Sequence, residues 1–381
     1  MYPEIGNEME KLDPNILSGM DSPSPYFLPE NTEVLAYARH GLNSSWATFF
    51  KISVRHAGGD EENYFMKVSI GHHGREALKG EFTATSAIHE RVPGFCPKPI
   101  AWGTFANDAD AHFYICKFYD FQGEDIPDPE DICEQLAILH NSESPNGKFG
   151  FECVTYNGNL PQDNTWFDNW EAFFAHGLRH VLNLREERGG TCAELDDLLP
   201  HLFDVVIPRL LRPLESDGRK VKPSLVHGDL WYGNTGITSD TKAVVYDPAS
   251  FWAHNECRVS LRDMQIRLLP AELESPLTCF TDELGNWRPD RNRFSGDYIA
   301  EYHRLIPKSE PVEDWDDRNA LYELKFASTI IVTPATFEHA NAIAFSANAQ
   351  QSVSANEQDV PVITDSSTAK STPVSITNVE V

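Results

Sequence analysis

Residues 225–234 of the chain read LVHGDLWYGN, and residues 243–250 read AVVYDPAS. Each stretch is a short apolar run that ends in an acidic residue, Asp229 in the first and Asp247 in the second, and Asn234 follows five positions after Asp229. Either aspartate alone is better explained as a turn residue at the end of a strand. Together the three residues match what phosphoryl transfer requires, which is a base for the acceptor hydroxyl and hard oxygen ligands for Mg²⁺.

A lysine and a glutamate nearer the N-terminus supply the positive charge that phosphates need. Lys67 lies in the middle of the predicted strand YFMKVSI, and alone it would be explained as a lysine that reaches solvent from a sheet face. Glu81 lies on the apolar face of the next predicted helix, where a carboxylate is costly to bury without a cation. We therefore predict an ion pair between Lys67 and Glu81, the arrangement that holds the α- and β-phosphates of ATP in kinases.

The turn between the first two predicted strands is a further candidate for phosphate binding. It contains Gly41, Ser44 and Ser45, whose small side chains allow backbone N–H groups to approach phosphate oxygens. The turn lacks the GxGxxG spacing, so a plain hairpin turn explains it equally well.

Length, charge and cysteine content restrict the class of protein. The chain has 381 residues, of which 41% are hydrophobic, and its formal net charge is -27. Nucleic-acid phosphates and anionic membranes would repel such a chain, so neither is an expected partner. The sequence opens with no signal-peptide pattern, has no apolar run of about 18 residues, and spreads seven cysteines without a CxxC pair. We expect a cytoplasmic protein with reduced thiols that is a monomer or a weak dimer.

Hydrophobic patterning divides the chain into four segments. Residues 1–32 are rich in proline and predict an irregular arm. Residues 33–120 predict an N-terminal lobe that clamps the ATP phosphates, built from short strands and a helix at residues 75–91. Residues 121–332 predict a mainly helical C-terminal lobe with the catalytic loop, metal site and acceptor site, and residues 333–381 predict a divergent, disordered tail. The predicted strands lie at residues 33–39, 46–55, 64–70, 99–103 and 111–121.

Three local patterns add detail to the two lobes. Asp131 and Glu134 have the spacing of a capping box, which predicts that a helix begins at Asp131. Aromatic and apolar residues recur at helical spacing over residues 166–184, and we attribute this face to core packing rather than to a cofactor. His72 and His73 are expected in a loop before the first helix, without a metal role.

The strings HGDLWYGN and YDPASFWAH, at residues 227–234 and 246–254, resemble the fructosamine kinase family, also called ketosamine-3-kinases or protein-ribulosamine 3-kinases. Trp231, placed directly after Asp229 and Leu230, is characteristic of this family. The resemblance covers roughly residues 33–325. It implies an α+β, two-lobed protein-kinase-like fold, related to aminoglycoside phosphotransferases, with a small N-lobe of antiparallel sheet and one helix and a larger, mainly helical C-lobe.

The family resemblance also implies an activity. That activity is ATP-dependent and Mg²⁺-dependent phosphorylation of the third-carbon hydroxyl of a ketosamine, the rearranged adduct of a sugar on a lysine amine. The phosphorylated adduct is unstable and falls away, so the enzyme would repair glycated proteins. Its substrates would be glycated proteins or small ketosamines.

By position, the resemblance gives each candidate residue a role. Asp229 would be the catalytic base, His227 would brace the loop, and Asn234 and Asp247 would bind Mg²⁺, with Asn234 counted also among the catalytic residues. Trp231 would stack against or shape the sugar site, although a buried structural tryptophan is an equal alternative.

The same resemblance implies a nucleotide site in the N-lobe. Lys67 would clamp the phosphates with Glu81 as its partner, and the adenine would bind backbone groups near Cys116 and Phe118, between the lobes.

Two departures from the family pattern leave alternatives open. The phosphate loop reads HGLNSSW and lacks a cysteine that many members carry, and the sequence after Leu324 does not resemble the family. One alternative is a kinase of the same fold that acts on another hydroxylated substrate, such as an aminoglycoside or a free sugar. The other is a pseudokinase that binds nucleotide without turnover.

Overall fold

The structure, a computed structural model, describes residues 32–41, 46–106, 108–121, 123, 125–191, 193–257, 293–294 and 296–330. All of them belong to one compact unit, Met1–Ala340. Apart from Thr32, the predicted N-terminal arm lies outside the described residues, as does the predicted tail at residues 333–381. No helix in the described part of the chain is long and apolar enough to cross a membrane.

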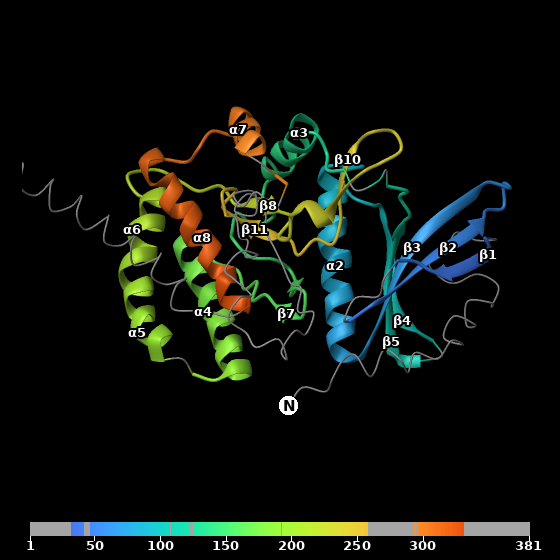
Figure 1. The fold of residues 1–381 in the computed structure, drawn as a ribbon, viewed down its shortest axis with the longest axis horizontal. Helices are drawn as coiled ribbons and strands as arrows, with labels where there is room; N and C mark the ends of the chain where they lie inside the picture. Colours follow the sequence, from blue (N-terminus) through green and yellow to red (C-terminus); the bar gives the residue numbers. More distant parts are fainter. Residues whose placement is uncertain are drawn as a thin grey trace, which may run out of the picture. The chain divides into compact units, whose positions relative to one another are not determined.

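An antiparallel sheet with the strand order β1-β2-β3-β5-β4 forms the N-terminal part (Figure 1). The first strand has the predicted bounds, whereas β3 begins three residues earlier than predicted, at Glu61. This extension exists because Glu61, Glu62 and Asn63 pair with Arg55, Val54 and Ser53 on β2. The strands are β1 (Glu33–Arg39), β2 (Thr48–Arg55), β3 (Glu61–Ile70), β4 (Pro99–Phe105) and β5 (Asp108–Lys117).

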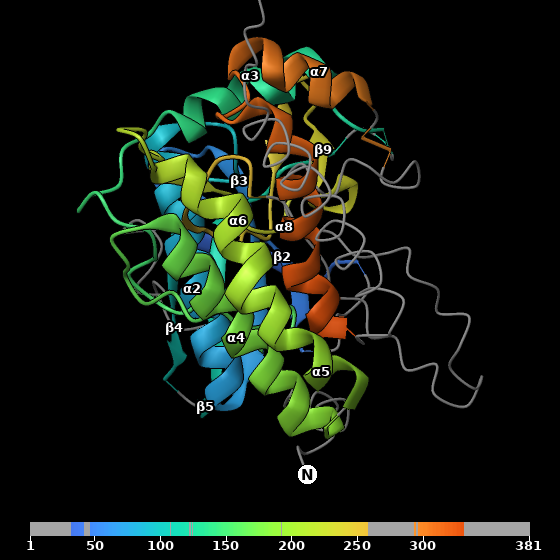
Figure 2. The same ribbon diagram turned by 90° about the vertical axis from the view of Figure 1, so that its left-hand side faces the viewer.

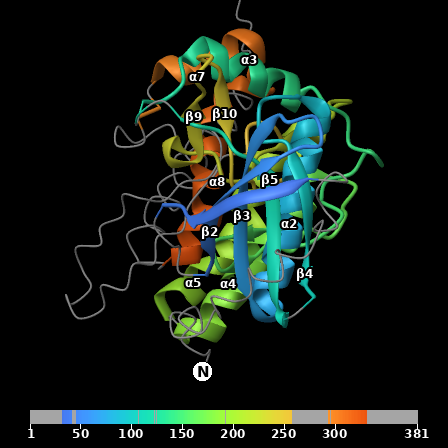
Figure 3. The same cartoon turned by 90° about the vertical axis from the view of Figure 1, so that its right-hand side faces the viewer.

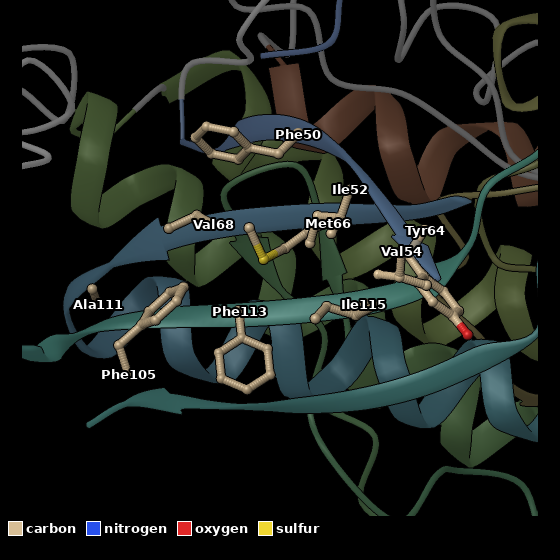
Figure 4. Close-up of a cluster of buried hydrophobic side chains, with 10 residues drawn as sticks. All are labelled: Phe50, Ile52, Val54, Tyr64, Met66, Val68, Phe105, Ala111, Phe113 and Ile115. Atoms are coloured by element: carbon tan, nitrogen blue, oxygen red, sulfur yellow. The ribbon is translucent and has the colours of Figure 1, made fainter. Parts of the chain in front are cut away.

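The two faces of this sheet bury different sets of side chains, because successive residues of a strand point to opposite faces. One face forms an apolar cluster (Figure 4) whose members are Phe50, Ile52, Val54, Tyr64, Met66, Val68, Phe105, Ala111, Phe113 and Ile115. The other face packs on the helix α2 (Gly71–Arg91), which lies along the sheet in the ribbon of Figure 3. Tyr114, Cys116 and Leu78 make this contact. Lys67 alternates with Met66 and Val68, so its side chain lies on the α2 face.

The helix α2 begins four residues earlier than predicted. Ile70 is still extended, with φ of -117°, and Gly71 turns the chain with φ of 75°, so β3 passes into the helix without a loop. His72 and His73 therefore lie in the first turn of α2, and the predicted loop at these residues is wrong.

The second part of the chain consists of helices around short strands. Figure 2 shows α4, α6 and α8 side by side, and these three helices contact one another. Two small antiparallel pairs, β8 with β11 and β9 with β10, carry the two acidic segments. The helices are α3 (Pro129–His140), α4 (Trp170–Gly189), α5 (Ala193–His201), α6 (Ile207–Leu211), α7 (Gly296–Leu305) and α8 (Trp315–Ile330), with short turns at Leu202–Val206, Arg212–Glu215, Tyr232–Asn234 and Val312–Asp314. The strands are β6 (Tyr156–Asn157), β7 (Leu160–Pro161), β8 (Ser224–Val226), β9 (Thr235–Ile237), β10 (Ala243–Val245) and β11 (Phe251–Ala253).

The predicted capping box at the start of α3 is wrong. The cap is Asp128, whose side chain accepts a hydrogen bond from the Glu130 amide, and Pro129 occupies the first turn, where its missing N–H costs nothing. Asp131 instead makes a contact distant in sequence: its carboxylate accepts a hydrogen bond from the Ala243 amide at 2.6 Å.

The aromatic residues of α4 pack in the core, as predicted. The helix begins at Trp170 rather than at Trp166, and Asn169 caps it. Trp170 and Phe173 are 0% and 1% exposed, and the indole N–H of Trp170 donates to the Tyr322 hydroxyl on α8 at 2.9 Å. The fold class predicted from the sequence is confirmed, whereas the lobe boundary near residue 120 stays a prediction.

Candidate active site

Lys67 lies between two carboxylates that come from distant parts of the sequence. Its ammonium nitrogen is 2.7 Å from Oε1 of Glu81 on α2 and 2.6 Å from Oδ1 of Asp247, which follows β10. Lys67 is 2% and Glu81 9% exposed. The ion pair predicted between Lys67 and Glu81 is present. Lys67 also contacts Asp247, which was predicted only as a metal ligand.

The charges of these three groups depend on one another. Burial disfavours the charged form of Lys67, but the attraction of Asp247 and Glu81 outweighs burial and raises the pKa of Lys67. Burial raises the pKa of Glu81 to about 7, although the attraction of Lys67 acts to lower it. The lysine therefore stays charged across the physiological pH range, while Glu81 is close to its titration point.

Two aromatic rings frame the ammonium group of Lys67. Its nitrogen lies 5.9 Å from the ring centroid of Trp46 and 5.8 Å from that of Phe49. The faces of aromatic rings attract cations at such distances. Trp46 directly follows in sequence the turn proposed to hold phosphates. Neither aromatic residue could be predicted as part of the site from the sequence, since a strand aromatic carries no signal beyond core packing.

Asp247 has a left-handed backbone conformation with φ of 58°. Few residues other than glycine adopt it, although aspartate and asparagine do so more often than others. Such conformations persist where the surrounding structure fixes them, and they cluster at functional sites. Here the preceding residue is fixed, because the ring of Tyr246 stacks on Phe121 with centroids 5.3 Å apart, and its amide donates to the Asn234 carbonyl at 3.0 Å.

The imidazole of His227 joins the two acidic segments. Its Nδ1 accepts a hydrogen bond from the Asp229 amide at 3.1 Å, and its Nε2 donates to the Tyr246 carbonyl at 3.1 Å. These partners require the neutral ring with its proton on Nε2. His227 is 0% exposed, so the buried ring holds the backbone of Asp229 at a fixed place relative to the residue before Asp247.

A hydrogen bond to the backbone of Asp229 fixes the side chain of Asn234. Its Nδ2 donates to the Asp229 carbonyl at 2.8 Å, so the amide nitrogen points back into the loop. The Oδ1 atom is then the end of the side chain that a cation would bind. This hydrogen bond leaves Oδ1 for a cation, and the role of Asn234 as a magnesium ligand stays a prediction.

Gly228 allows the two acidic segments to pack against each other. It has φ of 81°, and a Cβ atom there would overlap the carbonyl group of Ala249. The Ala249 amide donates to the His227 carbonyl at 2.9 Å. Both the φ angle and the contact require glycine at this position.

Trp231 lies over its own loop. A Cβ atom on Gly233 would lie 2.5 Å from Cζ2 of the Trp231 indole, and the ring of Tyr232 meets the indole edge to face at 4.8 Å. The indole is half-buried. Both alternatives for Trp231, a role at the sugar site and a structural role, therefore stay predictions.

The residues predicted to bind adenine lie at the end of β5. The Cys116 thiol is buried, and burial raises its pKa to about 12. The amides of Lys117 and Phe118 donate to the carbonyls of Lys98 and Asn63 at 2.8 and 3.0 Å. An adenine ring at this edge would therefore have to use other backbone groups than these two amides.

The predicted phosphate turn is only partly described. Gly41 has a left-handed conformation with φ of 68°. Ser44 and Ser45 lie outside the described residues, so their part in a nucleotide site stays a prediction.

Comparison with known protein families gives an independent result. The family model described as fructosamine kinase matches residues 42–270 of this chain. A ketosamine-3-kinase of the mouse is 32% identical over 286 residues, which cover 70% of this chain and 81% of the mouse protein. A chloroplastic protein-ribulosamine 3-kinase of indica rice is 26% identical over 264 residues, which cover 69% of this chain and 66% of the rice protein.

Solved structures support the same fold. The crystal structure of a fructosamine-3-kinase candidate from Thermobifida fusca aligns with a TM-score of 0.54 at 21% identity, covering 82% of this chain and 94% of that one. An aminoglycoside phosphotransferase aligns with a TM-score of 0.50 at 12% identity, covering 89% of this chain and 98% of that one. At these identities the likeness establishes the fold alone. The match to the family model, which spans more than half of the sequence and contains the motifs around Asp229 and Asp247, shows that this chain belongs to the fructosamine kinase family.

Proposed function

We propose that this protein is a ketosamine-3-kinase, which phosphorylates the third-carbon hydroxyl of ribulosamines or fructosamines on glycated proteins and so leads to their deglycation. The observation that carries the proposal is the contact of Lys67 with both Glu81 and Asp247, at 2.7 and 2.6 Å, within a chain of this family. A lysine in this position can hold ATP phosphates beside a metal-binding carboxylate.

The reaction requires a base close to the acceptor hydroxyl, and we assign this role to Asp229. As the oxygen on the third carbon attacks the γ-phosphorus, an oxygen–phosphorus bond forms and the bond from the γ-phosphorus to the bridging oxygen of ADP breaks. The hydroxyl proton passes to the Asp229 carboxylate, and ADP leaves. His227 contributes by fixing the Asp229 amide, since positioning supplies most of the catalysis in phosphoryl transfer.

The donor groups near Asp247 fit a magnesium ion. Mg²⁺ prefers oxygen ligands and commonly takes one or two from the protein, with phosphates and water for the rest. Asn234 offers its Oδ1 atom, and the Asp247 side chain is 44% exposed, so both can be reached by a hydrated ion. The bound ion would neutralise charge on the β- and γ-phosphates. Asp247 would then exchange its contact with Lys67 for the ion, which frees the ammonium group to bind phosphate.

The remaining assignments are proposals of the same kind. Gly41, Ser44 and Ser45 would cover the phosphates, backbone groups near Cys116 and Phe118 would bind adenine, and ATP would be the phosphoryl donor. Cys96, Cys116 and Cys153 form no disulfide in the described part of the chain, and we propose a cytoplasmic location. We propose no nucleic-acid or membrane partner, on the ground of the net charge of -27, and a monomer or weak dimer.

A panel of acceptors tests the proposed function. ADP release with MgATP would be measured on a ribulosyl-lysine peptide, a fructosyl-lysine peptide and an aminoglycoside, with Asp229→Asn as the matched control. We expect turnover on one or both ketosamines that is lost in the variant. Turnover on the aminoglycoside alone would favour another acceptor class, and nucleotide binding without any turnover would favour a pseudokinase.

A further inference from the structure

Helix α2 touches the helical part of the protein at Gly80, next to Glu81. A Cβ atom built on Gly80 would lie 2.5 Å from the Val154 carbonyl oxygen and 3.3 Å from Cα of Thr155. Glycine is a poor helix former in the interior of a helix, so another requirement must explain it here. That requirement is the close approach of backbone to backbone, which any larger residue would prevent.

Thr155 carries this contact to the segment that follows Asp247. It is 0% exposed, and its hydroxyl shares a proton between the carbonyls of Ala249 and Ser250, at 3.3 and 3.4 Å. The same hydroxyl accepts hydrogen bonds from Gln162 and Asn164 at 3.1 and 2.8 Å. Gln162 also donates to the Ala249 carbonyl at 2.9 Å, so this carbonyl is bonded from two sides.

Ala249 completes a continuous path to the catalytic loop. Its amide donates to the His227 carbonyl at 2.9 Å, and its carbonyl group packs on Gly228. His227 in turn accepts from the Asp229 amide at 3.1 Å. Backbone and buried polar contacts therefore connect α2 to both acidic residues of the site.

The far end of α2 is tied to the same region. The guanidinium of Arg91 lies 4.9 Å from the ring centroid of Trp252 on β11. Just beyond the helix, the Phe95 carbonyl accepts from the Val245 amide at 2.8 Å, two residues before Asp247. With Gly80 in the middle of the helix, these contacts restrict both translation and tilt of α2 relative to β10 and β11.

We propose that Gly80, Val154, Thr155, Gln162 and Ala249, here called the brace, are positioning residues that fix Glu81 and Lys67 relative to Asp229 and Asp247. In the structure Lys67 lies 2.7 Å from Glu81 and 2.6 Å from Asp247, and hydrogen bonds weaken steeply when they lengthen, so a small shift of α2 would move Glu81, and the lysine that it holds, away from the metal and phosphate positions beside Asp247. The brace sets this spacing through its backbone contact at Gly80 and the hydrogen bonds of Thr155 and Gln162. The proposal rests on the proposed kinase function of this site.

The first test is Gly80→Ala, with Gly296→Ala as the matched control. Gly296 begins α7, and a Cβ atom there would meet nothing within 4 Å, so alanine at this position changes helix propensity alone. The dissociation constant of MgATP, measured calorimetrically without acceptor and well below the melting temperature, should rise about tenfold or more in Gly80→Ala, and kcat/KM should fall by about 10- to 100-fold. Both values should stay within about twofold of the wild type in Gly296→Ala.

A second pair of variants keeps the proposal testable if Gly80→Ala folds poorly. Thr155→Val removes the hydroxyl at nearly constant volume, and Thr155→Ser restores it. Thr238→Val is the control, because Thr238 is 4% exposed and its hydroxyl bonds to Asp240 and Lys242 of its own turn. We expect weaker MgATP binding in Thr155→Val, recovery in Thr155→Ser and no change in Thr238→Val.

A residue of purely structural importance would behave differently. It would lower the melting temperature of Thr155→Val yet leave the MgATP dissociation constant and kcat/KM of the folded protein unchanged, and that result would overturn the proposal. Because nucleotide binding is measured without acceptor, a wild type that phosphorylates no ketosamine would refute the proposed function and still leave the brace tested.

Discussion

Replacing Lys67 by methionine should destabilise the protein more at alkaline than at neutral pH. Methionine fills most of the space of the lysine stem but leaves the Glu81 carboxylate buried, 9% exposed, without its cation. A buried carboxyl group that has lost its partner takes up a proton rather than remain charged. The loss of unfolding free energy in the variant therefore increases with pH, because protonation of Glu81 becomes less favourable as the pH rises.

The magnitude follows from the pKa of Glu81. In the wild type this pKa is raised to about 7, so folded Glu81 ionises above that pH, whereas glutamate in an unfolded chain has a pKa of about 4.3. Between these values the folded state binds more protons than the unfolded state, and stability falls by about 1.4 kcal/mol per pH unit. The wild type stops losing stability above about pH 7, but the variant continues to lose it. From about pH 6.5 to about pH 8.5 the difference between them should grow by about 2 kcal/mol.

Urea unfolding followed by tryptophan fluorescence measures this difference at the two pH values. Glu81→Gln and the double variant Lys67→Met/Glu81→Gln are the controls, because neither has a carboxyl group to titrate at this position. The pH-dependent increment should be absent from the comparison of these two variants. An increment below about 0.5 kcal/mol in Lys67→Met, or one of equal size in the double variant, would refute the account of Glu81.

Three further predictions concern the acidic segments and the helical core. Asp247→Asn should weaken MgATP binding at least about tenfold and metal-free ADP binding by less than about twofold, because it removes an anionic ligand, and calorimetry with and without Mg²⁺ checks this. His227→Ala should lower kcat about tenfold or more while nucleotide affinity is kept, because the Asp229 amide loses its acceptor; an unchanged kcat would show that the loop needs no such support. Arg318→Met should cost about 3 kcal/mol of unfolding free energy, because Arg318 and Glu256 are 0% and 1% exposed and Glu256 would lose its cation. Adding Glu256→Gln should recover much of that loss in the same urea titration, and no recovery would rule out the unpaired charge as its cause.

The sequence predicted those features that depend on local pattern or on charge cost. The helical spacing placed Glu81 on the apolar face of its helix, and the cost of burying an unpaired carboxylate then pointed to Lys67, the nearest candidate cation upstream, as its partner. The packing of the aromatic face of α4 in the core was predicted from the helical spacing of its apolar residues alone. The motif strings gave the family, and with it the fold.

Features that depend on tertiary contacts could not be predicted from the sequence. Asp131 has the spacing of a helix cap, but Asp128, followed by Pro129 in the first turn, takes that role. The hydrogen bond from the Ala243 amide to Asp131 is visible only in the fold. The contact of Lys67 with Asp247 joins residues 180 positions apart. Thr155 has no local signal at all, because its importance comes from the carbonyl groups that surround it.

The most direct test of the central claim is mass spectrometry of a ribulosyl-lysine peptide incubated with the protein and MgATP. We predict that each peptide gains one phosphoryl group from ATP, that the phosphate lies on the oxygen of the third carbon, and that the unmodified lysine then appears as the adduct falls away. Asp229→Asn should produce neither species while still binding MgATP. A wild type that binds MgATP but leaves both ribulosyl-lysine and fructosyl-lysine peptides unphosphorylated would contradict the claim that this site is a ketosamine kinase.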